Sequence, residues 1–488
     1  MLVPCPPADR RCAIIDIGSN SIRLVIYPVG RRVPSTLLNE KVSARLGKTL
    51  QVDNRLPDKA IDVALRGLAR FAAIVDAVGV ESLTVVATAA VRDAVNGPDF
   101  LEMVRGLGLS PTLLSGSEEA AASAQGVLCA FPEAEGIVAD LGGGSLELVE
   151  VGAGDAGTGV TLPLGTLRLA KMREKNTTRG LQVMRGLIEA RSPRGWARNR
   201  PLYVVGGSWR ALAQFAMHEI GWPIRSPHGF VLEPSRIAHL VSVLSHTTSV
   251  NIKNAGVSTA RAGSIGDAAL VLSALVRHLQ PSRIVISSFG LREGLAFAQL
   301  PNAQRAEDPL ISSLTDQLRE LARGTIYGEP LHRWATPLFT GESAAESRLR
   351  LAASWLGFAI RQRETAIRRS SILEFAFGEN WIGIDAEGRA RLAATLMAFI
   401  GEKVLPPELA QIASRDHLEQ ACQWGVVMRL GQRLSAGVAT LLEATAARRH
   451  ADMLELTLPR DRAIYGETAQ QQHAATAAAL GLMPATTD

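Results

Sequence analysis

The chain carries almost the same strand–turn–strand pattern twice. The first copy reads AIIDIGSNSIRLVIY (residues 13–27) and the second reads GIVADLGGGSLELVEV (136–151). In each copy an apolar run is followed by Asp, an apolar residue and Gly, then by a short turn and a second apolar run. Apolar runs on both sides of a Gly-rich turn predict a β-hairpin. Two hairpins about 120 residues apart predict two α/β units of similar build.

The repeated turn has the composition of a phosphate cradle. A tight Gly/Ser turn leaves backbone N–H groups free to point at an anion. Asp16 and Asp140 precede the two turns and would repel phosphate unless a cation lay between, and Mg²⁺ prefers oxygen ligands. A single DLGGGS could be a hairpin that merely needs glycine. The second copy favours two lobes that face one another across a cleft and bind the same phosphates.

Strand and helix signals alternate around both hairpins and then give way to helices. The periodicity predicts helices over 58–77 and 117–131, the second capped by Ser117. Further strands are expected over 83–88, 111–116, 202–207 and 283–290. After about residue 303 helical patterns dominate. The end is expected to hold a helix over 438–450, a strand over 453–460, a helix over 466–482 and a frayed terminus.

These patterns divide the chain into four expected domains. They are a first lobe (1–133), a second lobe (134–302), a helical domain (303–437) and a small C-terminal α+β domain (438–488). The length of 488 residues by itself predicts about three domains.

Composition favours a soluble protein of a reducing compartment. The four cysteines are scattered, with no CxxC pair, which argues against a disulfide framework or a zinc site. The first residues hold prolines and charges but no apolar core of a secretory signal. No stretch approaches the 18 apolar residues that a membrane span needs. The expected location is the cytoplasm.

Positive charge is concentrated in two stretches. Residues 171–200 hold nine Lys/Arg against two Glu, and basic residues recur over 348–371. Each stretch is either a solvated basic face or a track for a polyanion. Few aromatics accompany these charges, so binding to phosphates is favoured over stacking on nucleic-acid bases. No specific nucleic acid and no membrane is expected as a partner.

An ordered set of motifs resembles one family. The motifs are DIGSNSIRLVI (16–26), ATAAVRDAVNG (87–97), SGSEEA (115–120), DLGGGSLELV (140–149), LPLGTLRL (162–169) and SSFGLREGLAFA (287–298). Their order is similar to that of the exopolyphosphatase / guanosine pentaphosphate phosphatase (Ppx/GppA) family, over roughly residues 12–302. The resemblance implies two actin/hexokinase-like lobes (ASKHA, ribonuclease H-like), followed by an all-α degenerate HD-like domain and a small C-terminal domain. It also implies hydrolysis of a terminal phosphoanhydride by an activated water.

The resemblance assigns roles to the acidic residues. Glu119 matches the family's catalytic carboxylate and could accept a proton from the attacking water. Its neighbour Glu118 is better explained as a helix N-terminal acid. Asp140 and Glu147 flank the second turn and are expected to act in catalysis and, with Asp16, to hold Mg²⁺. The alternative for Glu147 is a solvent-facing strand residue. Whether K⁺ stimulates the reaction stays open.

Phosphate binding is assigned to one arginine and to the turns. Arg92 is expected to clamp the phosphate chain, because Arg suits bidentate phosphate contacts; the alternative is an ordinary surface arginine. The expected donors around the terminal phosphate are Asn20, Ser21, Gly143, Gly144 and Ser145.

Two departures from the family pattern limit the resemblance. At TARAGSIGDAALVL (259–272) relatives usually carry an acidic residue soon after the Arg, which puts one contact of the second lobe in doubt. The helical domain lies where longer relatives have a fold resembling the His-Asp metal phosphohydrolases, but residues 351–372 carry no His. A second metal site there is not expected.

The sequence supports a first hypothesis and two alternatives. The first is a processive Mg²⁺-dependent exopolyphosphatase acting on inorganic polyphosphate. The second is a phosphatase for the 5′ end of guanosine pentaphosphate, which could use the same groups. The third is a non-catalytic phosphate- or nucleotide-sensing regulator, against which the four acids Asp16, Glu119, Asp140 and Glu147 argue. A homodimer is expected by analogy with the family.

Overall fold

The computed structural model describes residues 10–48, 50–175, 177–320, 324–460 and 463–487. By its internal contacts the chain divides into two units: residues 1–222 with 227–309, here called the lobed unit, and residues 223–226 with 310–488, here called the helical unit. None of the helices in the described ranges is both long and apolar enough to cross a membrane.

The first lobe of the lobed unit is a five-stranded sheet in the order β3-β2-β1-β4-β5. Strands β1, β2 and β3 are antiparallel neighbours, whereas β4 and β5 continue the sheet in parallel with β1. The strands are β1 (Arg11–Ile17), β2 (Ile22–Pro28), β3 (Leu38–Val42), β4 (Ser82–Ala87) and β5 (Pro111–Leu113); the helices are α1 (Leu50–Asp53), α2 (Asp58–Val78), α3 (Ala89–Arg92) and α4 (Gly97–Arg105).

The second lobe is a six-stranded sheet in the order β10-β11-β9-β6-β7-β8. Its first two strands again form an antiparallel hairpin, and β9 and β11 continue the sheet in parallel. The strands are β6 (Gly136–Leu141), β7 (Leu146–Gly152), β8 (Asp155–Leu162), β9 (Pro201–Val205), β10 (Val231–Leu232) and β11 (Arg283–Ser287). The helices after β8 are α6 (Thr166–Lys175), α7 (Thr177–Arg191), α8 (Gly207–Glu219), α9 (Ile237–His246), α10 (Ser249–Asn254), α11 (Thr259–Ala262) and α12 (Ile265–Leu279).

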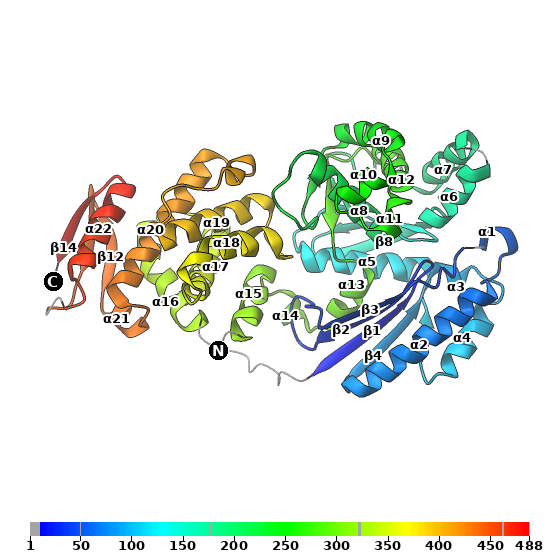
Figure 1. Cartoon of the computed structure of the whole chain (residues 1–488), viewed down its shortest axis with the longest axis horizontal. Helices are drawn as coiled ribbons and strands as arrows, with labels where there is room; N and C mark the ends of the chain where they lie inside the picture. The colour runs from blue at the N-terminus through cyan, green and yellow to red at the C-terminus, as the bar shows by residue number, and fades with distance from the viewer. Residues whose placement is uncertain (1–9, 49, 176, 321–323, 461–462, 488) are drawn as a thin grey trace. The chain divides into compact units, whose positions relative to one another are not determined.

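Helices cover both faces of each sheet, which makes each lobe a three-layered α/β unit. One face of the first sheet packs on α2 and α4, as Figure 1 shows for α2. One face of the second sheet packs on α7, α8, α9 and α12. The two remaining faces are covered by α5 (Gly116–Ala130) and α13 (Leu291–Ala298), which contact each other (Figure 1). The chain then continues through α14 (Asn302–Arg305).

Glycine allows α5 and α13 to approach closely. A Cβ atom at Gly294 would lie 1.8 Å from the carbonyl oxygen of Ala122, and one at Gly126 would lie 2.2 Å from that of Gly290. Only residues without a side chain fit at such a distance. This crossing fixes α5, and with it Glu119, relative to the end of β11.

The helical unit is built from helices and ends in a small sheet. The helices are α15 (Pro309–Glu320), α16 (Gly324–Ala335), α17 (Ala344–Arg361), α18 (Arg368–Leu373), α19 (Ala386–Ile400), α20 (Arg415–Ser435), α21 (Ala439–Glu443) and α22 (Glu467–Ala479). The sheet has the order β12-β13-β14, formed by β12 (Ala446–His450), β13 (Met453–Thr457) and β14 (Met483–Thr487).

The predicted elements of the lobes are confirmed with small shifts, and three predictions need correction. Both hairpins form, and the helix predicted over 58–77 is α2. The cap of α5 is Ser115 rather than Ser117, because the Ser115 hydroxyl accepts the N–H of Glu118 in a capping box. The helix expected over 438–450 ends at Glu443, after which β12 begins. The expected frayed terminus is β14, which pairs in parallel with β13.

Candidate active site

The two repeated turns have the same backbone geometry. The N–H of Gly18 donates to the carbonyl of Ser21 at 3.3 Å, and the N–H of Gly142 donates to the carbonyl of Ser145 at 3.0 Å. Each hairpin therefore closes through a four-residue turn from Gly to Ser. The similarity that the sequence shows in letters is also a similarity of hydrogen bonding.

The two turns lie against one another. A Cβ atom at Gly144 would lie 2.6 Å from the Ser19 hydroxyl, and one at Gly143 would lie 3.2 Å from the Ser19 Cβ. A side chain on either glycine would therefore fill the space between the turns. The predicted arrangement of two lobes with facing turns is confirmed.

A polar cleft of about 160 Å³ opens at these turns. Most of the predicted site residues line it: Asp16, Asn20, Ser21, Glu119, Asp140, Gly143, Gly144 and Ser145. Two predicted residues do not. Glu147 is buried, with 1% of its surface exposed, and Arg92 lines a neighbouring pocket. The roles assigned to all of these residues stay predictions; what the structure shows is their positions.

Strand register pairs the Asp of each hairpin, which lines the cleft, with one residue of the neighbouring strand. Asp16 of β1 lies opposite Arg23 of β2, and Asp140 of β6 lies opposite Glu147 of β7. Residues directly opposite in an antiparallel pair point to the same face of the sheet. The first hairpin thus presents an acid with a base, and the second presents two acids.

The two acids of the second hairpin are held in unusual environments. Burial raises the pKa of Glu147 well above its ordinary value, and the neighbouring Glu119 and Asp140 raise it further. Within the described residues its Oε1 atom has no hydrogen-bond partner. Burial also raises the pKa of Asp140, although the Ser123 hydroxyl donates a hydrogen bond to its Oδ2 atom and opposes this shift.

Glu119 is positioned by the first turn of α5. Glu118 accepts hydrogen bonds from the N–H and hydroxyl of Ser115, so it serves as a capping residue, as expected. The next residue, Glu119, turns into the cleft and accepts a hydrogen bond from Arg92 at 3.0 Å. Burial raises the pKa of Glu119 to about 7; Arg92 acts in the opposite direction, and Asp140 adds to the rise. A carboxyl with a pKa near 7 suits a general base at neutral pH.

Arg92 is tied to the protein rather than free in the cleft. Its Nη1 atom donates both to Glu119 and to the carbonyl of Leu114, at 2.9 Å for the latter, and its Nε atom lies 3.7 Å from Asp93. It is therefore not an ordinary surface arginine. Its position beside Glu119 gives it an effect on the pKa of that carboxyl.

The acids of the second hairpin fit a divalent cation. Two facing carboxylates, one of them buried with an unpartnered oxygen, leave charge that a cation would neutralise. Mg²⁺ is commonly held by one or two carboxylates together with substrate phosphates and water. Among the described residues, groups of three or more His, Cys, Asp or Glu placed to hold a metal ion are absent. Asp16 instead lies 3.8 Å from the Nε atom of Arg292.

Four arginines that the sequence analysis did not assign also line the cleft. They are Arg23, Arg210, Arg261 and Arg292. Backbone and hydroxyl oxygens orient two of them: Arg210 donates to the carbonyl of Ser288 at 3.0 Å, and Arg261 donates to the hydroxyl of Ser208 at 3.1 Å. Burial lowers the pKa of Arg23, Arg210 and Arg261, and neighbouring arginines lower it further. Such a cluster is stabilised by a polyanion.

The sequence holds partial indications of these four arginines. Arg23 lies in the motif DIGSNSIRLVI (16–26), and Arg292 lies in SSFGLREGLAFA (287–298). Each is in or beside an apolar run, so from the sequence each resembles a surface residue of a strand or helix. Arg261 lies in the segment where the family resemblance weakens, and the structure nevertheless places it in the cleft. The register of β1 with β2 places Arg23 opposite Asp16, whereas Arg210, Arg261 and Arg292 come to the cleft from α8, α11 and α13.

The two basic stretches are only partly free to bind a ligand. In the first stretch, Arg198 donates to Gln280 and Arg200 pairs with Glu150. In the second stretch, Arg350 is fully buried and forms an ion pair with Glu342 at 2.9 Å. Arg350 therefore stabilises the helical unit and belongs neither to a solvated face nor to a surface track.

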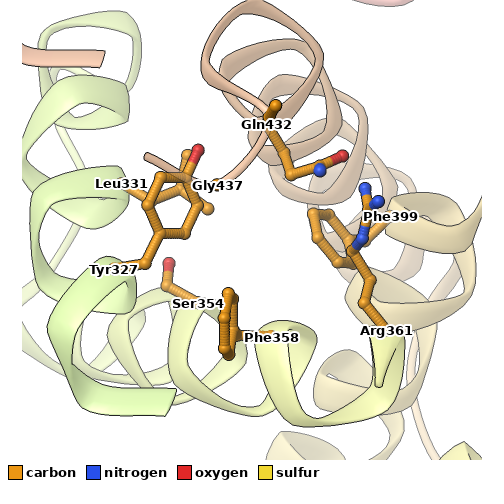
Figure 2. Close-up of a pocket in the computed structure, with 9 residues that line it drawn as sticks. Tyr327, Leu331, Ser354, Phe358, Arg361, Phe399, Gln432 and Gly437 are labelled. Atoms are coloured by element: carbon orange, nitrogen blue, oxygen red, sulfur yellow. The ribbon is translucent and has the colours of Figure 1, made fainter. Parts of the chain in front are cut away.

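A pocket in the helical unit has a different character from the cleft. Figure 2 shows it between α16, α17, α19 and α20, bordered by the rings of Tyr327, Phe358 and Phe399, with Arg361 and Gln432 approaching it. Its volume is about 60 Å³. Aromatic walls with a single cation do not match the acids, hydroxyls and backbone donors of the cleft, so the cleft is the candidate active site.

Comparison with known proteins points to the same part of the chain. The model of the Ppx/GppA phosphatase family matches residues 25–303, which is more than half of the chain. Exopolyphosphatase 1 of Mycobacterium leprae is 28% identical over 306 residues, which cover 59% of this chain and 89% of that protein. A crystal structure of the Aquifex aeolicus member of the Ppx/GppA family is 25% identical, with a TM-score of 0.51, and covers 59% of this chain and 97% of that one.

One further relative matches beyond the lobes. Retrograde regulation protein 2 of Saccharomyces cerevisiae is 25% identical over 472 residues, which cover 87% of this chain and 77% of that protein. The structural likeness supports the actin-like α/β fold predicted for the lobes. The HD-like character of the helical domain, the kind of C-terminal domain and the three boundaries between the four expected domains stay predictions.

Proposed function

Because the chain belongs to the Ppx/GppA phosphatase family, we propose that it is an exopolyphosphatase that hydrolyses the terminal phosphoanhydride of inorganic polyphosphate. The observation that carries the proposal is a buried carboxyl, Glu119, whose pKa burial raises to about 7, in a cleft lined by two Gly/Ser turns and four arginines. A protein whose name states this activity matches 59% of this chain.

The chemistry requires a positioned phosphate and a base. The backbone N–H groups and hydroxyls of the two turns would hold the terminal phosphate between the lobes. Ionised Glu119 would accept a proton as the water oxygen bonds to the terminal phosphorus. The bridging P–O bond breaks, its electron pair stays on the oxygen of the shortened chain, and orthophosphate is formed. Phosphoryl transfer of this kind depends mainly on positioning and charge neutralisation.

Asp140 and Glu147 are the residues proposed to hold Mg²⁺. When bound, Mg²⁺ would neutralise charge on the phosphate oxygens. Asp16 lies at the matching position of the first hairpin, beside Arg292, where it would orient that arginine toward the phosphate chain. The arginines Arg23, Arg210 and Arg261 would bind further phosphates of the chain, as processive release requires.

The same groups could serve a nucleotide substrate, so the test compares both. Purified protein is given long-chain polyphosphate or guanosine pentaphosphate at equal concentration, and orthophosphate release is measured with and without Mg²⁺. The proposal expects Mg²⁺-dependent release from polyphosphate. Cleavage of the nucleotide with polyphosphate left intact would instead make the chain a guanosine pentaphosphate phosphohydrolase. Binding without hydrolysis of either would favour a regulator, a role that the name of the yeast relative states for that protein.

A further inference from the structure

A second pocket adjoins the cleft at Ser145. This residue lines both cavities, and the second one has a volume of about 460 Å³. Glu119 lines the cleft, and Arg92, to which it is hydrogen-bonded, lines the second pocket. The hydrogen bond between Arg92 and the proposed general base therefore joins a residue of one cavity to a residue of the other.

The second pocket has the lining of a phosphate site. Two arginines and three hydroxyl groups face it: Arg92, Arg191, Ser117, Ser145 and Thr161. Guanidinium groups and hydroxyls are the side chains that donate hydrogen bonds to phosphate oxygens. The walls thus favour a small, strongly charged anion over an apolar ligand.

The acids near this pocket are already neutralised or turned away. Asp93 lines the pocket, but it is ion-paired with Arg168 and lies 3.7 Å from Arg92. Glu118, at the start of α5, is bonded to Ser115 as a cap. Arg191 is exposed at the end of α7, so it adds a positive charge that is accessible to an incoming anion.

If the polyphosphate chain stays bound between turnovers, a separate site for the product is needed. An enzyme that keeps a polyphosphate chain in the cleft between turnovers has that part of the cleft filled when orthophosphate forms. The product then needs a second place to go, next to the reacting carboxylate. The pocket that shares Ser145 with the cleft and Arg92 with Glu119 lies at that position.

We propose that this second pocket binds the orthophosphate released at each turnover while the chain stays in the cleft. The inference rests on the proposed function for the origin of the orthophosphate. The binding itself can be measured without any hydrolysis, which separates the two proposals.

The test compares two arginines of the same helix. Arg191→Ala removes a lining arginine, and Arg185→Ala, also on α7 but facing a different cavity, is the matched control. Wild type and both variants are titrated with inorganic phosphate by calorimetry, without polyphosphate. Arg191→Ala is expected to weaken one class of phosphate site by about tenfold, the effect of losing one charge-assisted contact. Arg185→Ala is expected to bind as wild type does.

A second readout uses inhibition by the product. Added orthophosphate should inhibit hydrolysis of polyphosphate non-competitively in the wild type, because it binds beside the chain and does not replace it. Arg191→Ala should raise the inhibition constant by about tenfold, whereas Arg185→Ala should leave it as in the wild type. Purely competitive inhibition, or equal phosphate binding in wild type and Arg191→Ala, would overturn the inference. If polyphosphate is not hydrolysed at all, the proposed function fails, and the titration still decides whether the pocket binds phosphate.

Discussion

The β1–β2 and β6–β7 hairpins share their backbone and differ in the residue that lies opposite their common Asp. Both have Asp before a Gly-to-Ser turn closed by the same hydrogen bond. Opposite that Asp, the first hairpin has Arg23 and the second has Glu147. The shared backbone supplies two sets of hydrogen-bond donors for phosphate. The residue opposite each Asp differs, and this difference suits the two hairpins to different roles. The first hairpin is suited to bind phosphate, and the second is suited to hold a cation near the reacting group.

The residues around the two hairpins differ as well. Burial raises the pKa of Glu119 to about 7, and Asp140 of the second hairpin and Asp16 of the first each add to the rise. At the first hairpin Asp16 lies near Arg292, and Arg23 is one of four arginines in the cleft. Substitutions on the two sides should therefore change different kinetic constants.

The largest effect is expected for Glu119→Gln, beside the second hairpin. Loss of a general base should lower kcat by about 10²- to 10⁴-fold while binding of polyphosphate changes little. Steady-state rates and a binding titration measure the two quantities. Glu118→Gln is the control, because glutamine can still cap α5. Activity that persists in Glu119→Gln would show that Glu119 is not the general base.

The next effect is expected for Glu147→Gln on the second hairpin. The substitution keeps the shape of a buried side chain and removes its charge, so the Mg²⁺ concentration for half-maximal rate should rise at least about tenfold. Titration of activity with Mg²⁺ measures this. Glu150→Gln, on the same strand and paired with Arg200 away from the cleft, should behave as wild type. An unchanged Mg²⁺ requirement in Glu147→Gln would place the cation elsewhere.

Arg23→Gln tests the residue of the first hairpin that corresponds to Glu147 of the second. Removal of one charged contact to the substrate should raise KM for polyphosphate by about tenfold, with a smaller effect on kcat. Arg70→Gln serves as the control, since this exposed arginine of the same lobe pairs with Glu40. If Arg23→Gln changed kcat and the Mg²⁺ requirement as Glu147→Gln does, the proposed division between the hairpins would be wrong.

The smallest effect is a shift in pH dependence. Glu119 must be ionised to accept a proton, so kcat/KM should rise with pH through about 7 and then level off. Arg92 lowers the pKa of Glu119, and therefore Arg92→Ala should move this rise to higher pH. Profiles of kcat/KM against pH for both proteins measure the shift. If the rise of kcat/KM in Arg92→Ala occurs at the same pH as in the wild type, or at lower pH, a group other than Glu119 controls the pH dependence.

Local sequence was enough to predict the elements of the lobes. Apolar runs around a Gly-rich turn specify a hairpin wherever they occur, and the repeat of that pattern predicted facing turns. The motif around Glu119 identified the helix that carries it, although the cap was assigned two residues too late. Residues close in sequence to a turn were therefore placed correctly, including Asn20, Gly143 and Ser145.

Features that depend on distant contacts were not predictable. Arg210, Arg261 and Arg292 reach the cleft from three separate helices or helix starts, so local sequence alone does not show their convergence. Arg350 lies in a stretch of basic residues typical of a surface, although Glu342 is only eight residues before it; its burial depends on how α17 packs against the other helices. The final strand, β14, is short and exposed, and only its pairing with β13 makes it a strand.

The most direct test of the account is orthophosphate release from long-chain polyphosphate, with chain lengths followed on a gel, with and without Mg²⁺. The account predicts Mg²⁺-dependent release in which full-length chains persist beside free phosphate, and loss of that release in Glu119→Gln. No release from polyphosphate under conditions where guanosine pentaphosphate is cleaved, or equal release by Glu119→Gln, would contradict it.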